Sequence, residues 1–128
     1  MLQTLAPPST VVLVDDDAAL RTALKFALEI EGFVVETWES GEELLASDLP
    51  TDHACLVLDY NLTGINGLTA LAELRRRDVQ LPALLITSHP RPAVRQAAAD
   101  MHARIVEKPL LGDALVGEIR DALATTDA

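Results

Sequence analysis

The stretch VVLVDDDAALRTAL, residues 11–24, decides the fold of this chain. Its first four residues are all apolar, without polar alternation, which predicts a short parallel strand covered on both faces. Three aspartates end that strand, at positions 15, 16 and 17. An amphipathic helix is expected from Ala18 to Glu31, with Asp17 as its N-terminal cap and Gly32 after its end. The stretch therefore predicts one strand-then-helix unit with acidic residues at the turn.

The same pattern of an apolar run followed by an amphipathic helix repeats along the chain. Further strands are expected over residues 33–38, 53–60, 81–88 and 104–106. Further helices are expected from Ser40 to before Pro50 and over residues 67–77, 92–100 and 113–123. Five such units require parallel strands joined by right-handed crossovers, with helices on both faces of one sheet. The sequence thus predicts an α/β fold with a doubly wound, five-stranded parallel sheet.

Length, charge and cysteine content exclude several classes of protein. The 128 residues suffice for one domain, expected over residues 10–124 between a flexible lead-in (1–9) and a tail (125–128). A net charge of −10 argues against direct nucleic-acid binding. The single Cys55 cannot form an internal disulfide, and we find neither a signal peptide nor a membrane span. A cytoplasmic protein is expected.

Doubly wound sheets bind ligands beyond the carboxyl ends of their strands, so polar residues at these ends are candidate site residues. They are Asp15, Asp16, Asp17, Asp59, Asn61, Thr87, Ser88 and Lys108. Carboxylates about 4 Å apart repel by on the order of 4 kcal/mol at an effective dielectric near 20, so the cluster needs a cation or raised pKa values. Oxygen ligands without a His or Cys set favour Mg²⁺, and the EF-hand spacing of Ca²⁺ sites is absent.

Each candidate also has a purely structural interpretation. An aspartate after a strand is often only a helix cap, and Thr87 alone is an ordinary strand residue. Asp59 is harder to explain in this way, because it follows the apolar run 55–58, where an unpaired charge is costly. Lys108 follows a strand that is expected inside the sheet. Their joint occurrence at four strand ends favours a functional site.

Four segments together resemble the receiver domain of two-component response regulators. They are VVLVDDDAALRTAL (11–24), LVLDYNLTGINGL (56–68), LLITS (84–88) and VEKPL (106–110). They occur in the order of that family and near its spacing, within about residues 10–124. The resemblance implies the flavodoxin-like fold, with strand order 2-1-3-4-5 and five helices on both faces.

The resemblance also implies roles for individual residues. Asp59 matches the phosphoacceptor, and Asp15 and Asp16 match the acidic pair that binds Mg²⁺ directly and through water. Asn61 stands where the family contributes a backbone carbonyl to the metal. The remaining matches are Thr87, for the hydroxyl residue that bonds one phosphoryl oxygen, and Lys108, for the lysine that pairs with another.

Other positions are expected to modulate this chemistry. Asn61 and His89 lie two residues beyond Asp59 and Thr87, where receiver domains place side chains that tune the access of water; His89 is equally an ordinary loop histidine. Ser88 adjoins this position. Three departures from the family pattern are Ile105 in place of the usual Tyr or Phe, Thr63 in place of a usual proline, and Met101-His102-Ala103 in place of a common Ala-Gly pair. We therefore expect the conformational response to run through residues 88–104 rather than through an aromatic switch.

The function implied is a phosphoacceptor module rather than an enzyme, with Mg²⁺-dependent self-phosphorylation and autodephosphorylation only. The expected partners are a histidine kinase or histidine phosphotransfer protein and a downstream protein or fused effector domain. The output surface implied comprises the strands expected over 81–88 and 104–106 and the helices over 92–100 and 113–123. The two helices, with Leu110 and Leu111 beside them, also offer a homodimer surface.

Two alternatives stay open at this point. One is a receiver-like interaction domain that signals without phosphorylation. The other is a phosphatase of the haloacid dehalogenase type, which would need an aspartate where Asn61 stands. The basic cluster Arg75-Arg76-Arg77 is interpreted as complementing the dipole of the helix that it ends, rather than as a docking patch.

Overall fold

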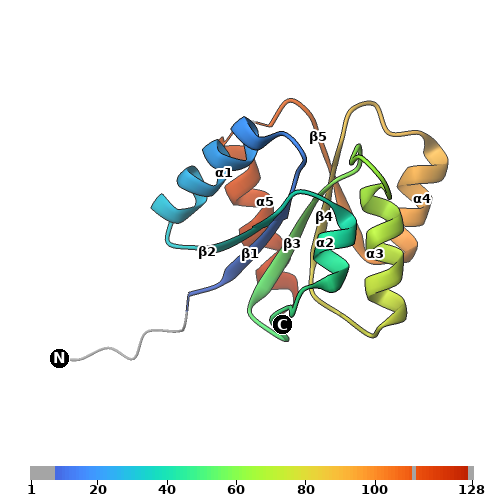
Figure 1. Ribbon diagram of the computed structural model, residues 1–128, viewed down its shortest axis with the longest axis horizontal. Helices are drawn as coiled ribbons and strands as arrows, with labels where there is room; N and C mark the ends of the chain where they lie inside the picture. Colours follow the sequence, from blue (N-terminus) through green and yellow to red (C-terminus); the bar gives the residue numbers. More distant parts are fainter. Residues whose placement is uncertain (1–7, 111, 127–128) are drawn as a thin grey trace.

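Five strands alternate with five helices along the chain (Figure 1). The computed structural model describes residues 8–110 and 112–126. The strands are β1 (Thr10–Val14), β2 (Val34–Trp38), β3 (Ala54–Asp59), β4 (Ala83–Thr87) and β5 (Ala103–Glu107). The helices are α1 (Ala18–Ile30), α2 (Gly41–Ala46), α3 (Gly67–Arg76), α4 (Pro92–Asp100) and α5 (Gly112–Thr126). Every element expected from the sequence is therefore present.

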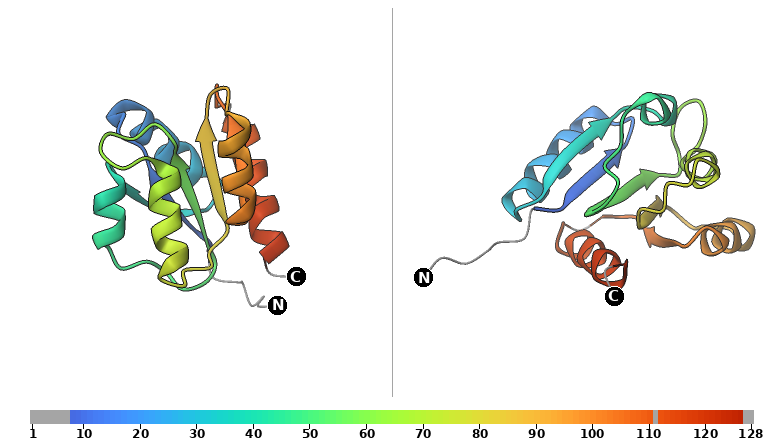
Figure 2. Two further views of the ribbon diagram at one scale, coloured as in Figure 1. Left: turned by 90° about the vertical axis from the view of Figure 1, so that its right-hand side faces the viewer. Right: turned by 90° about the horizontal axis from the view of Figure 1, so that it is seen from below.

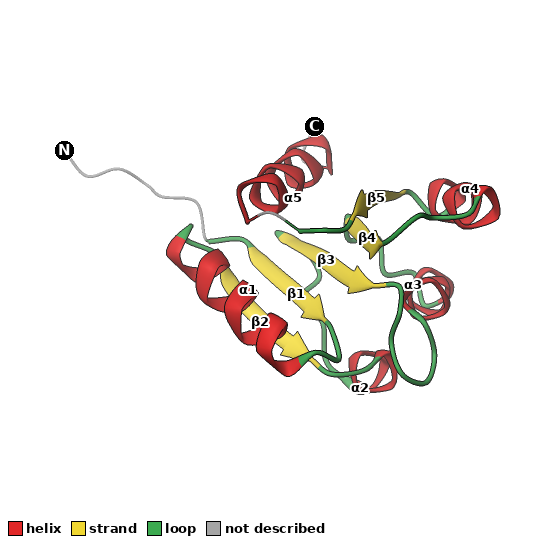
Figure 3. Cartoon of the chain, turned by 90° about the horizontal axis from the view of Figure 1, so that it is seen from above, coloured by secondary structure: helices red, strands yellow, loops and turns green. Residues whose placement is uncertain are grey.

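The strands form one parallel sheet in the order β2-β1-β3-β4-β5. This order confirms the doubly wound fold and the flavodoxin-like topology. In the register between β1 and β3, Val14 lies opposite Leu58, so the residues that follow each strand emerge side by side. The loops after β1 and β3 consequently meet at one end of the sheet (Figure 3).

Two apolar cores cover the sheet, one on each face. Alternate residues of β1 face opposite ways, Val12 and Val14 into one core and Val11 and Leu13 into the other. The first core is completed by side chains of α2, α3 and α4, which stand side by side (Figure 2, left). The second is completed by α1 and α5 (Figure 3). This double covering explains why β1, β3 and β4 have almost uninterrupted apolar sequences.

Helix starts follow from local hydrogen bonds. The carboxylate of Asp17 accepts from the Leu20 N–H at 3.1 Å, which confirms Asp17 as the cap of α1. At α2, the hydroxyl of Ser40 accepts from the Glu43 N–H at 3.1 Å. The Glu43 carboxylate accepts in return from the N–H of Glu39, one residue before the cap. The caps of α1 and α2 fix where the loops after β1 and β2 end.

The structure corrects several details of the sequence-based picture. The strand before Lys108 was expected inside the sheet, but β5 is an edge strand and its residues are half-buried or exposed. His53 precedes β3 at a φ of 50° instead of beginning it. Helix α5 continues to Thr126, two residues into the expected tail. Residues 1–7 of the lead-in, Leu111, and the end of the tail at 127–128 lie outside the described residues.

The basic cluster at the end of α3 does more than complement the helix dipole. Arg75 donates to the backbone carbonyls of Val79, Leu81 and Met101 at 2.8–2.9 Å, which ties α3 to the approach to β4 and to the end of α4. Arg76 and Arg77 form ion pairs with Glu73. Within the described part of the chain, no helix is long and apolar enough to cross a membrane.

Candidate functional site

Three carboxylates meet where β1 and β3 end. Asp15 follows β1 and is buried, Asp59 ends β3 and is buried, and Asp16 is exposed. One carboxylate oxygen of each lies within 4.8 Å of those of the other two. The parallel register of β1 and β3 brings these residues together, although Asp59 lies more than 40 positions after Asp15 and Asp16 in the chain. The sequence therefore predicted this cluster correctly.

Asp59 is held from several sides. Its carboxylate accepts from the Asn61 N–H at 3.0 Å and lies 3.3 Å from the ammonium group of Lys108. The carboxylate is only 6% exposed, so the ion pair with Lys108 supplies much of the charge compensation that water cannot. Behind it, the first residue of α3 is Gly67, where a Cβ would collide with the carbonyl oxygen of Asp59. A glycine is thus required for α3 to pack against the end of β3.

Asp15 has the least favourable environment for a charge. Burial, and then the nearby carboxylates of Asp59 and Asp16, raise the pKa of Asp15 above its usual value, while the Asp17 N–H and Lys108 oppose the shift. The Asp17 N–H donates to Asp15 Oδ1 at 2.8 Å. A carboxylate with these neighbours favours a cation beside it.

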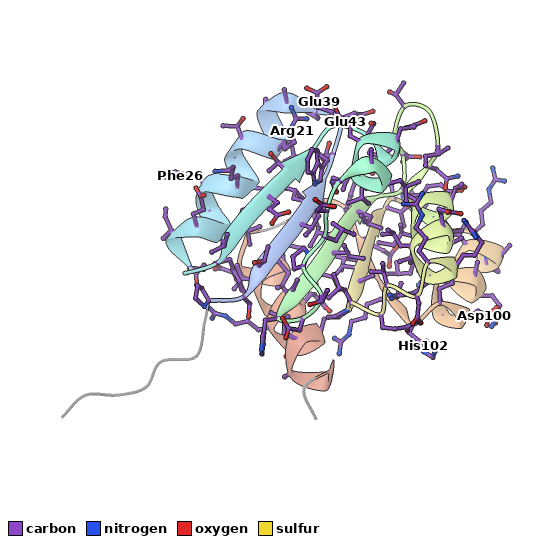
Figure 4. All side chains as sticks on the ribbon, turned by 60° about the horizontal axis from the view of Figure 1, so that its bottom comes forward. Arg21, Phe26, Glu39, Glu43, Asp100 and His102 are labelled. Carbon is purple, nitrogen blue, oxygen red and sulfur yellow. The ribbon has the colours of Figure 1, made fainter. Side chains whose placement is uncertain are left out.

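The backbone of this loop is fixed from α1. Arg21 donates to the carbonyl oxygen of Asp15 at 2.6 Å, and its guanidinium lies 3.5 Å from a carboxylate oxygen of Glu39. The Arg21 side chain is only 15% exposed. Arg21, Glu39 and Glu43 lie at the same end of the molecule (Figure 4). Sequence reasoning did not single out Arg21, since a helical arginine carries no local sign that it will reach back to a loop carbonyl.

Asp16 is held from the other loop. Its Oδ2 accepts from both the N–H and the hydroxyl of Thr63, at 3.0 and 2.9 Å. Thr63 was noted only as a departure from the family pattern, because a contact across 47 residues has no local signature in the sequence.

Thr87 and Lys108 complete the site. Thr87 ends β4 and is 2% exposed, and its hydroxyl is 3.4 Å from the carbonyl oxygen of Ser88. The N–H of Lys108 donates to the carbonyl oxygen of Thr87 at 2.9 Å, so the ends of β4 and β5 are joined beside Asp59. Ser88 and His89 are exposed in the loop that follows, and His89 has a φ of 46°.

A hollow of about 310 Å³ adjoins this group on the α4 side. It is lined by Tyr60, Asn61, Thr87, Ser88, His89, Pro90, Arg91 and Val94. Ile105 does not line it; this residue packs half-buried against the core beneath α4. Of the expected modulating residues, Asn61, Ser88 and His89 therefore line this hollow.

The donor set fits a hard divalent cation. The three clustered side chains offer carboxylate oxygens only, and the cluster carries more negative charge than Lys108 alone balances. Oxygen ligands of this kind suit Mg²⁺ better than a softer metal. Asp15, Asp16 and Asp59 are the side chains that would hold such an ion.

Comparison with known proteins identifies the family. The sequence model of the response regulator receiver domain matches residues 11–120. The chain belongs to this family of two-component signalling proteins, and the predicted resemblance is confirmed.

Individual relatives are transcriptional regulators. The chain is 35% identical over 114 residues to the C4-dicarboxylate transport transcriptional regulatory protein DctD of Pseudomonas aeruginosa, covering 88% of this chain and 25% of that protein. It is 33% identical over 114 residues to the transcriptional regulatory protein FixJ of Azorhizobium caulinodans, covering 88% of this chain and 54% of FixJ. The chain thus spans between a quarter and about half of these curated relatives.

Solved structures have the same fold. A CheY-like receiver domain from Methanospirillum hungatei superposes with a TM-score of 0.85 at 21% identity, covering 94% of this chain and 98% of that one. The response regulator StyR superposes with a TM-score of 0.83 at 32% identity, covering 93% of this chain and 61% of StyR. The fold expected from the sequence is therefore that of known receiver domains.

Proposed function

We propose that this chain is a phosphoacceptor that receives a phosphoryl group on Asp59 from the phosphohistidine of a histidine kinase or histidine phosphotransfer protein. The observation that carries the proposal is the position of the Asp59 carboxylate, between the acidic residues Asp15 and Asp16 and the ammonium group of Lys108. A phosphoryl group in transfer needs an in-line nucleophile and positive charge around its oxygens. The Asp59 carboxylate would be the nucleophile, and Lys108, with a cation held by the acidic residues, would supply the positive charge.

The transfer itself is a displacement at phosphorus. A carboxylate oxygen of Asp59 forms the new P–O bond while the P–N bond of the phosphohistidine breaks, and the imidazole leaves with the bond electrons and takes up a proton. The product is an acyl phosphate on Asp59. Bound Mg²⁺ would neutralise the negative charge of the carboxylates and of the phosphoryl oxygens. The bond energy comes from the donor, so the chain serves as acceptor and not as an enzyme acting on a separate substrate.

Two residues of the chain suit the roles of phosphoryl ligands. The Lys108 ammonium lies 3.3 Å from Asp59, where it can pair with a phosphoryl oxygen once the carboxylate is phosphorylated. The Thr87 hydroxyl has only a long contact of 3.4 Å with the Ser88 carbonyl, so turning it towards a phosphoryl oxygen costs little. That turn would change the position of residues 88–91 and of the start of α4. Partner binding through β4, α4, β5 and α5 would follow from this movement.

His89 is proposed to tune the lifetime of the acyl phosphate. It lines the hollow beside Thr87 together with Asn61, and it is exposed. From this position an imidazole can order or exclude the water that attacks phosphorus. In His89→Ala the half-life of phosphorylated Asp59 should change severalfold; an unchanged half-life would remove His89 from the mechanism and leave the acceptor role intact.

Intact mass spectrometry tests the acceptor role. Wild type and Asp59→Asn are incubated with acetyl phosphate or phosphoramidate, with Mg²⁺ or with EDTA. The expected result is the mass of one phosphoryl group gained by wild type with Mg²⁺, and by neither protein otherwise. No gain by wild type would refute the proposal and favour an interaction domain that works without phosphorylation.

A further inference from the structure

Thr63 connects the two loops of the site through its backbone N–H and its side-chain hydroxyl. Both hydrogen bonds donated by Thr63, one from its N–H and one from its hydroxyl, end on Oδ2 of Asp16. Thr63 belongs to the loop between β3 and α3, and Asp16 to the loop between β1 and α1. The contact therefore joins two segments of the chain that no strand pairing holds together at this point.

The loop that carries Thr63 is itself anchored. The carboxylate of Glu42 on α2 accepts from the Ile65 N–H at 3.2 Å, and Gly64 makes the intervening turn with a φ of 82°. At the far end of the loop, the Asn66 side chain caps α3 by accepting from the Thr69 N–H at 2.8 Å. Thr63 is consequently presented by a loop with fixed ends.

Each of the three clustered carboxylates has its own restraint. Asp15 accepts from a neighbouring N–H, and Asp59 from an N–H and from Lys108. Asp16 is the exposed member, so repulsion by the other two would turn its short side chain towards water. The two donors of Thr63 oppose this, and because both use Oδ2, they leave Oδ1 for a cation.

We propose that Thr63 is a positioning residue for the cation site, holding Asp16 in the conformation that binds Mg²⁺. This inference rests on the proposed function, since it assigns Mg²⁺ to the same cluster. The backbone N–H and the hydroxyl contribute separately. A valine at position 63 keeps the shape and the N–H but lacks the hydroxyl, a serine keeps both donors, and a proline has neither.

Mg²⁺ titrations followed by backbone NMR shifts test the proposal without any phosphoryl donor. Thr63→Val should raise the Kd for Mg²⁺ about threefold and Thr63→Pro about tenfold, which corresponds to about 0.7 kcal/mol for each hydrogen bond lost at the exposed Asp16 carboxylate. Thr63→Ser should remain within about twofold of wild type by the same reasoning. Thr51→Val is the matched control, because Thr51 is an exposed threonine before β3, at the opposite end of the sheet.

Unfolding by urea without Mg²⁺ is measured on the same variants. Equal Kd values for wild type, Thr63→Val and Thr63→Pro would overturn the proposal. It would also be overturned if Thr63→Ser raised the Kd for Mg²⁺ as much as Thr63→Val does. If Thr63→Pro fails to fold, the comparison of valine with serine still decides. Absence of Mg²⁺ binding by wild type would overturn the proposed function as well, whereas normal binding by wild type with unchanged variants would overturn only the role of Thr63.

Discussion

Replacing Asp15 with asparagine should stabilise the protein in the absence of divalent cations. Asp15 is 4% exposed, and its carboxylate lies within 4.8 Å of those of Asp16 and Asp59. Asparagine keeps the Oδ1 acceptor for the Asp17 N–H while it removes the charge. The protein therefore loses a source of repulsion and retains the hydrogen bond.

The size of the effect follows from the geometry. Two unit charges at such a separation repel by at least about 3.5 kcal/mol at an effective dielectric near 20, and Lys108 and salt offset part of this. We expect Asp15→Asn to raise the free energy of unfolding by about 1–2 kcal/mol near pH 7. Because burial raises the pKa of Asp15 in the folded protein, the penalty exists above that raised pKa. It disappears as the pH falls towards the ordinary aspartate value near 3.9, and so does the advantage of the variant.

Added Mg²⁺ should act in the opposite direction. At a concentration of 100 times its Kd, a ligand that binds only the folded state stabilises it by about 2.7 kcal/mol. Wild type should gain about this amount, and Asp15→Asn should gain much less.

Urea unfolding followed by circular dichroism, with EDTA and with Mg²⁺, measures both effects. Asp17→Asn is the matched control, because it also removes one negative charge but lies outside the cluster and preserves a good helix cap. Its stability should stay within about 0.5 kcal/mol of wild type under both conditions. An Asp15→Asn variant that is less stable than wild type in EDTA would refute the reasoning about repulsion.

Two further predictions concern packing and response. Gly67→Ala should destabilise the fold by about 2–4 kcal/mol, because the added Cβ meets the carbonyl oxygen of Asp59. Gly117→Ala on α5 adds a Cβ that has no atom within 4 Å, so it should stabilise the fold by up to about 1 kcal/mol. Thermal unfolding of the two variants distinguishes these effects. Addition of beryllofluoride, a phosphoryl mimic, with Mg²⁺ should shift the backbone NMR signals of residues 88–104, and unmoved signals would exclude a response through α4.

The fold was predictable because its signals are local. The uninterrupted apolar run 11–14 predicts a strand covered on both faces, and the structure places β1 inside the sheet, between β2 and β3, with Val11 to Val14 buried. The cap at Asp17 and the capping pair that begins with Ser40 follow from residue type and spacing alone. The acidic cluster could be predicted from the fold, because parallel strands bring their carboxyl ends to one edge of the sheet.

Long-range contacts were not predictable. Arg75 was expected only to complement a helix dipole, but it donates to three carbonyl groups, one of them 26 residues away.

All three histidines adopt positive φ, at 50°, 46° and 58° for His53, His89 and His102. Glycine is the usual sign of such a conformation, so these positions gave no sign in the sequence. The edge position of β5 is not encoded in the sequence of that strand, and it followed only from the strand order 2-1-3-4-5 that the family resemblance implied.

Borohydride trapping with peptide mapping tests the central claim most directly. Wild type is phosphorylated with Mg²⁺ and a small-molecule donor, and the acyl phosphate is reduced so that the modified aspartate becomes homoserine. The proposal predicts homoserine at position 59, with Asp15 and Asp16 unchanged and no reduction when Mg²⁺ is chelated. Homoserine at position 15 or 16, or an equal yield of reduced Asp59 with EDTA, would contradict it.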